Sequence, residues 1–179
     1  MYALSNKGFS LVEVIVVAAL IGFLSTLLLI NFSRTRVNLT ESMNAFGGDI
    51  RDAQSRTVSS TKFAGYIPCG YGITYIDSTH YALYAGPNAA TTTCSTINRN
   101  YSSGQDSIVY TKAIADSRLQ FQNSFTDIFF EPPDPKTYIN NNASLASSPQ
   151  NIVITKIGGA CPGDCQTIRI HTSGKIEIQ

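Results

Sequence analysis

The sequence predicts an α+β fold in which one long N-terminal helix packs on a C-terminal head of antiparallel β-strands. Two observations predict this architecture. An apolar run at residues 9–30 leads into a helical stripe of apolar residues, and the second half of the chain alternates short β-rich segments with polar turns. With 179 residues, 43% of them hydrophobic, the chain is long enough for one globular domain and an appendage.

The charge balance narrows the class of protein. The 13 Lys and Arg residues stand against 12 Asp and Glu residues, so the formal net charge is +1. This balance argues against a polybasic nucleic-acid-binding protein. No second apolar run of similar length follows the first, which argues against a polytopic transporter.

The apolar run is long enough to cross a membrane. At 1.5 Å per residue, its 22 residues span roughly 33 Å as a helix. A cleaved secretory signal would have a shorter apolar core, followed by small residues at the cleavage site. The apolar run at 9–30 is longer than such a core, and no site of small residues follows it. A simple anchor fits the length but does not explain Glu13, because a carboxylate inside hydrocarbon is costly and usually marks function.

The residues around Glu13 supply an explanation. Residues 7–13 read Lys-Gly-Phe-Ser-Leu-Val-Glu and resemble the type IV prepilin processing site, in which Gly, Phe and Glu stand at this spacing before an apolar helix. The resemblance implies cleavage between Gly8 and Phe9 by a prepilin peptidase, followed by methylation of the new Phe9 amine. It also implies that Glu13 neutralises the Phe9 amine of a neighbouring subunit during assembly. Ile30 stands where many pilins have Pro, so no kink is expected there.

The resemblance divides the chain into four parts. These are a leader peptide at 1–8, a transmembrane and polymerisation helix at 9–31, an amphipathic continuation at 32–60 and a β-rich globular head at 61–179. The continuation is predicted because apolar residues recur every three or four positions and form one stripe. The stripe consists of Phe32, Leu39, Met43, Phe46, Ile50, Ala53 and Thr57. We expect the helix to end near Ser59, with a bend or close packing at Gly47 and Gly48.

Eight strands are predicted in the head from β-rich segments bounded by turn residues. They lie at 71–76, 81–84, 107–114, 119–121, 127–130, 152–157, 167–171 and 175–178. The last two flank a good hairpin turn at 171–174. The segments 86–104, 131–150 and 158–165 are predicted to be loops.

The head carries a second resemblance. Residues 50–56, 69–75 and 173–178 are similar to the corresponding segments of GspH/FimT-type minor pseudopilins. The resemblance implies that the head belongs to this subtype.

The four cysteines all follow the apolar run, at Cys69, Cys94, Cys161 and Cys165. In an exported head they predict two disulfides, for which the sequence allows three connectivities. A disulfide between Cys161 and Cys165 could close a tight loop. A disulfide between Cys69 and Cys94 would then link the first hairpin to the long loop after it. Zinc ligation by Cys161, Cys165 and His171 is a less favoured alternative, because no fourth ligand is near in sequence.

No catalytic or metal site is predicted. Neither a Ser–His–Asp arrangement nor a carboxylate pair can be argued from spacing, so a membrane-anchored enzyme has no support beyond the presence of a head. The acids Asp127, Glu131 and Asp134 could bind calcium, but their spacing matches no known calcium loop and favours solvated turn residues. No cofactor and no metal are expected.

These features predict a structural subunit and not an enzyme. The subunit would be a minor pilin or pseudopilin of a type IV pilus, a type II secretion system or a competence filament. Its expected partners are other pilin or pseudopilin subunits, the prepilin peptidase/N-methyltransferase, the inner-membrane assembly platform with its ATPase, and membrane lipid before assembly. The expected location is the bacterial cytoplasmic (inner) membrane, with a single pass and the head outside, and then an extracytoplasmic filament.

A DNA-binding minor pilin in DNA uptake is the alternative. Lys156, Arg169 and Lys175 are the candidate contacts near the C-terminus. Asp164 and Glu177 lie in the same segment, so residues 150–179 have three cations, two anions and a net charge of +1. Because phosphate binding normally needs several clustered cations, DNA binding is the less favoured function.

Overall fold

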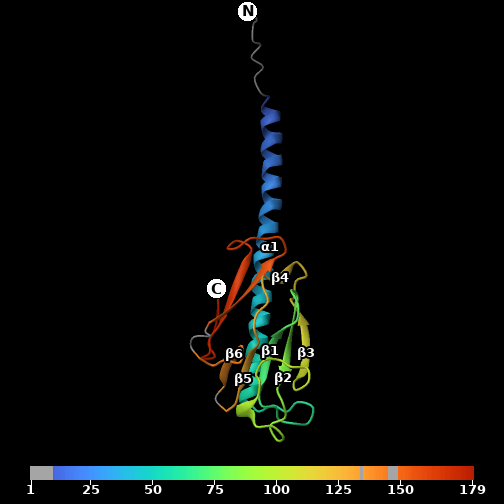
Figure 1. Ribbon diagram of the computed structural model, residues 1–179. Helices are drawn as coiled ribbons and strands as arrows, with labels where there is room; N and C mark the ends of the chain where they lie inside the picture. The colour runs from blue at the N-terminus through green and yellow to red at the C-terminus, as the bar shows by residue number, and fades with distance from the viewer. Residues whose placement is uncertain (1–9, 134, 145–148) are drawn as a thin grey trace, which may run out of the picture. The chain divides into compact units, whose positions relative to one another are not determined.

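The chain forms two compact units, residues 1–37 and residues 38–179. The computed structural model describes residues 10–133, 135–144 and 149–179, without the side chains of residues 27–37. A single helix, α1 (Leu11–Val58), runs through both units (Figure 1). Residues 38–179 are called the head unit below.

The N-terminal unit exposes apolar side chains. Leu11, Ile21 and Phe23 are each more than half exposed. Within the part of the chain that the structure describes, no helix has both the length and the apolar content needed to cross a membrane. The span at 9–31 therefore stays a prediction from the sequence.

The second half of α1 forms the spine of the head unit. Five members of the predicted stripe are buried in one core with residues of both sheets, at Leu39, Met43, Phe46, Ile50 and Ala53. The side chain of Phe32 lies outside the described part of the chain. The helix ends at Val58, one residue before the predicted end. Gly47 lies where α1 approaches the sheet closely, since a Cβ there would come within 3.3 Å of Ile168 Cδ1. The close packing expected at the two glycines is therefore present at Gly47.

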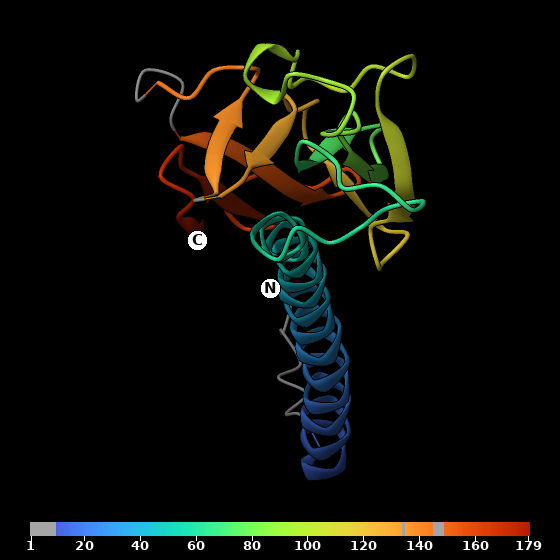
Figure 2. The ribbon, with the colours of Figure 1, turned by 90° about the horizontal axis from the view of Figure 1, so that it is seen from below.

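The strands of the head unit form two antiparallel sheets. The first has the order β3-β2-β1-β5-β6 and the second the order β4-β7-β8-β9. The strands of the first sheet are β1 (Tyr71–Tyr75), β2 (His80–Ala85), β3 (Ser107–Ala113), β5 (Ile128–Glu131) and β6 (Lys136–Ile139). Those of the second are β4 (Leu119–Phe121), β7 (Gln150–Lys156), β8 (Cys165–Ile170) and β9 (Ile176–Ile178). Figure 2 shows the strands gathered on one side of the C-terminal part of α1.

The α+β architecture predicted from the sequence is confirmed, with two differences in detail. The predicted loop at 131–150 contains β6, which pairs with β5 from Glu131 opposite Lys136 to Ile128 opposite Ile139. This segment directly follows Pro132, Pro133 and Pro135, which are turn signals in the sequence, and β6 forms because β5 supplies its hydrogen-bonding partner. The division into two sheets was also not predicted, because alternation indicates a strand but not its neighbour.

A partly buried polar cluster joins α1 to the first sheet. The Asp49 carboxylate accepts hydrogen bonds from the hydroxyls of Tyr81 and Tyr110, and Lys112 Nζ lies 2.6 Å from Asp49 Oδ1. Burial, together with the adjacent carboxylate, raises the pKa of both tyrosines well above the usual range. The hydroxyls therefore stay neutral donors, and the cluster fixes the rotation of the helix against β2 and β3.

Candidate functional site

The predicted processing residues, Gly8 and Phe9, lie outside the described residues. Glu13 lies in the first turn of α1, where its backbone N–H donates to the Ser10 carbonyl oxygen at 2.9 Å. A carboxylate in this turn interacts favourably with the positive end of the helix. Glu13 is exposed among exposed apolar neighbours. A carboxylate among apolar side chains is costly to bury unless it has a cationic partner.

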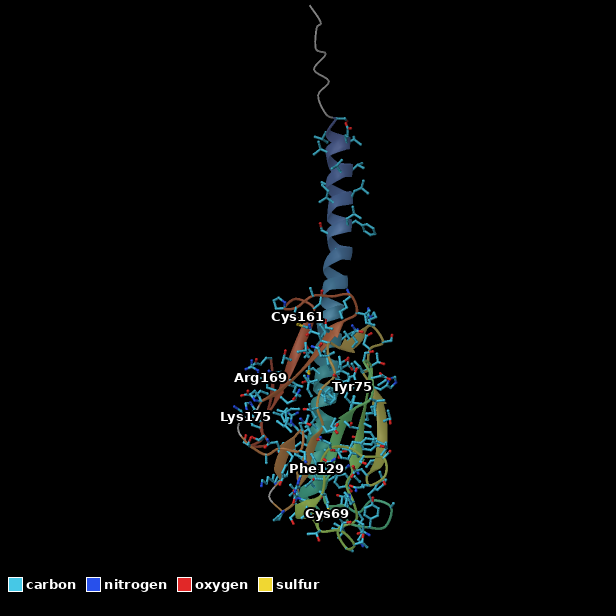
Figure 3. All side chains as sticks on the ribbon, viewed as in Figure 1. Cys69, Tyr75, Phe129, Cys161, Arg169 and Lys175 are labelled. Carbon is cyan, nitrogen blue, oxygen red and sulfur yellow. A yellow bond between two sulfur atoms is a disulfide. The ribbon has the colours of Figure 1, made fainter. Side chains whose placement is uncertain are left out.

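Two disulfides lie at opposite ends of the head unit (Figure 3). Cys69, just before β1, is bonded to Cys94 in the short helix η1 (Cys94–Thr96), and this bond ties the loop after β2 to the first sheet. Cys161 is bonded to Cys165 and closes the turn that enters β8. This pairing is one of the three that the sequence allows.

The two disulfides are expected to differ in their effect on stability. They close segments with sequence separations of 25 and 4. The loop-entropy relation then gives about 3.5 kcal/mol for Cys69–Cys94 and about 2 kcal/mol for Cys161–Cys165. We expect the double substitution Cys69→Ala/Cys94→Ala to lower the free energy of unfolding more than Cys161→Ala/Cys165→Ala. Urea unfolding of the full chain in detergent without reductant measures both. Equal losses, or the reverse order, would contradict the expectation.

Arg99 holds the loop between β2 and β3 in place. Its guanidinium forms an ion pair with Glu131 at 2.8 Å, and the two side chains are only 10% and 16% exposed. The same group donates to the carbonyl oxygens of Ile97 and Cys94 and lies 4.0 Å from the centre of the Tyr138 ring. Sequence reasoning missed this residue, because an arginine in a polar loop is normally expected to be exposed to solvent, and its partner Glu131 lies 32 positions away.

A buried carboxyl closes the same loop. Asp106 accepts a hydrogen bond from the Ser102 backbone N–H at 2.7 Å. Burial, with a smaller contribution from the nearby Asp127, outweighs the Ser102 hydrogen bond and raises the pKa of Asp106 to about 6. The folded head unit therefore keeps a proton on Asp106 that the unfolded chain has already lost above a pH of about 4.

This shift predicts a pH dependence of stability. The contribution of Asp106 to the free energy of unfolding falls as the pH rises from about 4 to about 6 and is constant above that range. In Asp106→Asn, the side-chain amide oxygen can still accept the hydrogen bond from the Ser102 backbone N–H, but the side chain no longer gains or loses a proton. We expect the variant to gain stability relative to the wild type between pH 4.5 and pH 7.5, measured by urea unfolding. A difference that does not change with pH would contradict this assignment.

The described residues that were considered for metal binding have other partners, including His171, whose Nε2 lies 3.2 Å from Glu177 Oε2. The disulfide between Cys161 and Cys165 leaves no thiolate there to bind zinc. Asp127 accepts a hydrogen bond from the Tyr101 backbone N–H at 2.7 Å, and Glu131 is paired with Arg99. Asp134 lies outside the described residues. Among the residues that the structure describes, no group of three or more His, Cys, Asp or Glu is placed to hold a metal ion.

The candidate DNA contacts do not form one patch. Arg169 and Lys175 lie on the same side of the head unit (Figure 3), but Glu177 stands opposite Arg169 in the β8–β9 pair and is ion-paired with Lys175. Lys156 is five residues along β7 from Asn151, the partner of Arg169, a distance of about 16 Å. An odd separation also directs the two side chains to opposite faces. This arrangement does not favour phosphate binding.

Two comparisons with known proteins gave a match, one over the N-terminal segment and one over most of the chain. The family model "Prokaryotic N-terminal methylation motif" matches residues 4–29. A solved structure similar to this chain is that of the type IV minor pilin FimU of Pseudomonas aeruginosa (strain PAO1), with 11% sequence identity, 80% of this chain and 90% of that chain covered, and a TM-score of 0.49. A comparison with curated proteins gave no match. Residues 4–29 of this chain therefore carry the prokaryotic N-terminal methylation motif.

Proposed function

We propose that the protein is a minor pilin or pseudopilin of the GspH/FimT type, a structural subunit of a type IV pilus, type II secretion or competence filament. The observation that carries the proposal is the methylation motif at residues 4–29, which overlaps the start of a continuous 48-residue helix leading into the head unit. The motif supplies a processed N-terminus. The helix supplies the element that polymerises, and the head unit is the part displayed on the filament.

The assembly step follows from the charges at the N-terminus. Cleavage after Gly8 leaves a cationic amine on Phe9, four residues before Glu13. In a bundle of apolar helices, an unpaired charge of either sign is strongly unfavourable. Pairing of Glu13 with the Phe9 amine of a neighbouring subunit removes both penalties and sets the axial register. The subunit would be drawn from the membrane into the filament by an assembly platform and its ATPase.

The disulfides support a head outside the cytoplasm. Both bonds lie in the head unit, and disulfides persist in oxidising compartments. A single pass at 9–31 then places the head unit on the outer side of the cytoplasmic membrane before assembly.

Processing at Gly8 is the test of this proposal. In a bacterial host with prepilin peptidase, we expect the wild-type chain to begin at a methylated Phe9 and to lack four hydrogens because of its two disulfides. Gly8→Val is expected to keep the intact N-terminus, since a branched side chain at the cleavage site blocks the peptidase. The measurement is intact mass with N-terminal sequencing of protein extracted without reductant.

Gly22→Ala is the matched control for this experiment. It changes another glycine of the motif, where an added Cβ meets nothing within 4 Å, so processing should proceed as in the wild type. A wild-type chain that starts at Met1 despite active peptidase would overturn the proposal.

A further inference from the structure

A pocket of about 480 Å³ opens in the connection between β2 and β3, at residues 86–106. Its volume is within the roughly 300–1,000 Å³ that is typical of small-molecule sites. The residues that line it lie between Pro87 and Gln105 in the sequence, and each of those lining residues is uncharged. The pocket is called the loop pocket below, and the connection that forms it is called the β2–β3 loop. Through its disulfide, this loop is held at the end of the head unit where Cys69 is labelled in Figure 3.

The β2–β3 loop is long and yet firmly held. Connections longer than about 12–15 residues with little secondary structure of their own are usually either functional or disordered. This connection contains one short helix, η1, and is tied to the first sheet by the Cys69–Cys94 disulfide. The Arg99 guanidinium also donates to the carbonyl oxygens of Cys94 and Ile97, at 3.3 and 3.1 Å. A long loop that is ordered in this way is typical of a binding loop on a rigid scaffold.

The first residues of the loop are fixed to the segment before β1. The Pro87 carbonyl oxygen accepts a hydrogen bond from the Cys69 backbone N–H at 2.8 Å, and the Ala89 backbone N–H donates to the Ile67 carbonyl oxygen at 2.9 Å. These bonds are made by the backbone and use no side chain that lines the pocket. A ligand would therefore meet a preformed pocket, and little conformational entropy would be lost on binding.

Three side-chain amides line the loop pocket and are accessible to solvent. Asn98 and Gln105 are exposed, and Asn88 is half-buried. Asn88 and Asn98 use their Oδ1 atoms to accept the backbone N–H groups of Ala90 and Asn100, at 2.9 and 3.1 Å, which leaves the N–H donors of each Nδ2 group for a ligand. The hydrogen bond that Gln105 makes within the loop comes from its backbone N–H, so its side-chain amide offers both a donor and an acceptor.

Two apolar residues, Pro87 and Ile97, line the same pocket. Ile97 is 8% exposed, because most of its side chain packs with Cys69 and Tyr84 in a second, smaller core. Pro87 is half-buried and presents more of its ring. Uncharged donors and acceptors beside limited apolar surface match a sugar ring, which has hydroxyl groups around its edge and C–H groups on its faces.

We propose that the loop pocket binds a neutral saccharide that carries an N-acetyl group. The sugar hydroxyls and the acetamido group would form hydrogen bonds with the amides of Asn88, Asn98 and Gln105, and the acetamido methyl and the C–H face would contact Pro87 and Ile97. An N-acetyl group is favoured over a plain hydroxyl because it brings a donor, an acceptor and a methyl group, each of which has a partner in the pocket. This binding activity goes beyond the proposed structural role, and it depends on neither processing nor assembly.

A neutral ligand is favoured because the charged residues of the β2–β3 loop already have partners. Arg99 is ion-paired with Glu131 and only 10% exposed, and Asp106 is 8% exposed and accepts the Ser102 backbone N–H. Burying a carboxylate or a phosphate against uncharged groups is unfavourable, because the charge loses water and gains no counter-charge. An acidic sugar should therefore bind more weakly than a neutral one.

The proposal is tested by titration of the full chain with N,N′-diacetylchitobiose, followed by calorimetry and by saturation-transfer NMR. The detergent is of the polyoxyethylene type, because maltoside detergents carry a neutral saccharide themselves. We expect saturable binding of this probe. Cellobiose, which has the same linkage but hydroxyls in place of the N-acetyl groups, should bind at least fivefold more weakly. N-acetylneuraminic acid, which carries an N-acetyl group and a carboxylate, should also bind more weakly than the probe.

Two substitutions test the amides without disturbing the loop. Asn98→Asp keeps the Oδ1 acceptor for the Asn100 N–H and removes the Nδ2 donors, and Gln105→Ala removes an exposed amide. We expect each variant to bind the probe at least fivefold more weakly than the wild type. Asn123→Asp is the matched control, because it makes the same change at an exposed asparagine outside the loop pocket, and it should bind as the wild type does.

Three results would overturn the proposal. The first is no saturable binding of the probe by a chain whose circular dichroism shows it folded. The second is equal weakening by Asn98→Asp and Asn123→Asp, which would place binding outside the loop pocket. The third is equal affinity for cellobiose and the probe, which would remove the N-acetyl group from the recognition. Because the titration requires neither cleavage at Gly8 nor a filament, its failure would leave the proposed function standing, and a chain that is not processed could still bind the probe.

Discussion

Phe46→Ala is expected to lower the free energy of unfolding of the head unit by about 3–5 kcal/mol. Phe46 is 1% exposed, and its ring lies 4.8 Å from that of Tyr81 and 5.5 Å from that of Phe121, centre to centre. It therefore connects α1 to a strand of each sheet. Removing it creates a cavity at the junction of three elements, which cannot close without moving the helix. A loss of this size is a large part of the total stability of a domain.

The measurement is urea unfolding of the full chain in detergent, followed by near-ultraviolet circular dichroism of the nine tyrosines. Val58→Ala is the matched control, because it truncates another apolar residue of α1 that is 55% exposed. The control should change the free energy of unfolding by less than about 0.5 kcal/mol. A Phe46→Ala loss no larger than that of the control would contradict the packing described here.

Glu13→Gln is expected to leave cleavage at Gly8 intact and to prevent stable incorporation into a filament. The amide has nearly the same shape as the carboxylate but no charge, so the Phe9 amine of the neighbouring subunit would be buried without a partner. Breaking a buried ion pair by removing one charge is typically unfavourable by about 3–5 kcal/mol, enough to displace a polymerisation equilibrium by about two to four orders of magnitude.

The readout for Glu13→Gln is the ratio of subunit in sheared filaments to subunit in the membrane, taken from immunoblots of the two fractions. Glu13→Asp is the control, because it keeps the charge at the first turn of α1 and shortens the side chain by one methylene. We expect the aspartate variant to retain a measurable part of wild-type incorporation. Normal incorporation of Glu13→Gln would show that charge pairing does not drive assembly.

The sequence by itself determined the helix and most of the strands. Leu39, Met43 and Phe46 form a stripe because only one face of α1 can be buried, and that periodicity is local. The eight predicted strands match strands of the structure, since β-rich segments between turn residues are also local signals. The turn before β9 follows the same rule, with Gly174 at φ +82° where the hairpin requires a left-handed residue. The processing motif is local as well, and it could therefore be identified without any structure.

The tertiary structure decided the features that depend on contacts between residues distant in sequence. β6 is a strand because β5 lies beside it, and Arg99 is a buried ion-pair residue because Glu131 comes to it across 32 positions. The loop that carries Asp116 lies against α1, where Asn38, 78 residues earlier in the chain, donates a hydrogen bond to the Asp116 carboxylate. Periodicity and propensity describe neighbours along the chain, whereas these features arise from packing between segments. For that reason, the helix and the processing site could be predicted from the sequence, while the surroundings of Arg99, Asp49 and Asp116 could not.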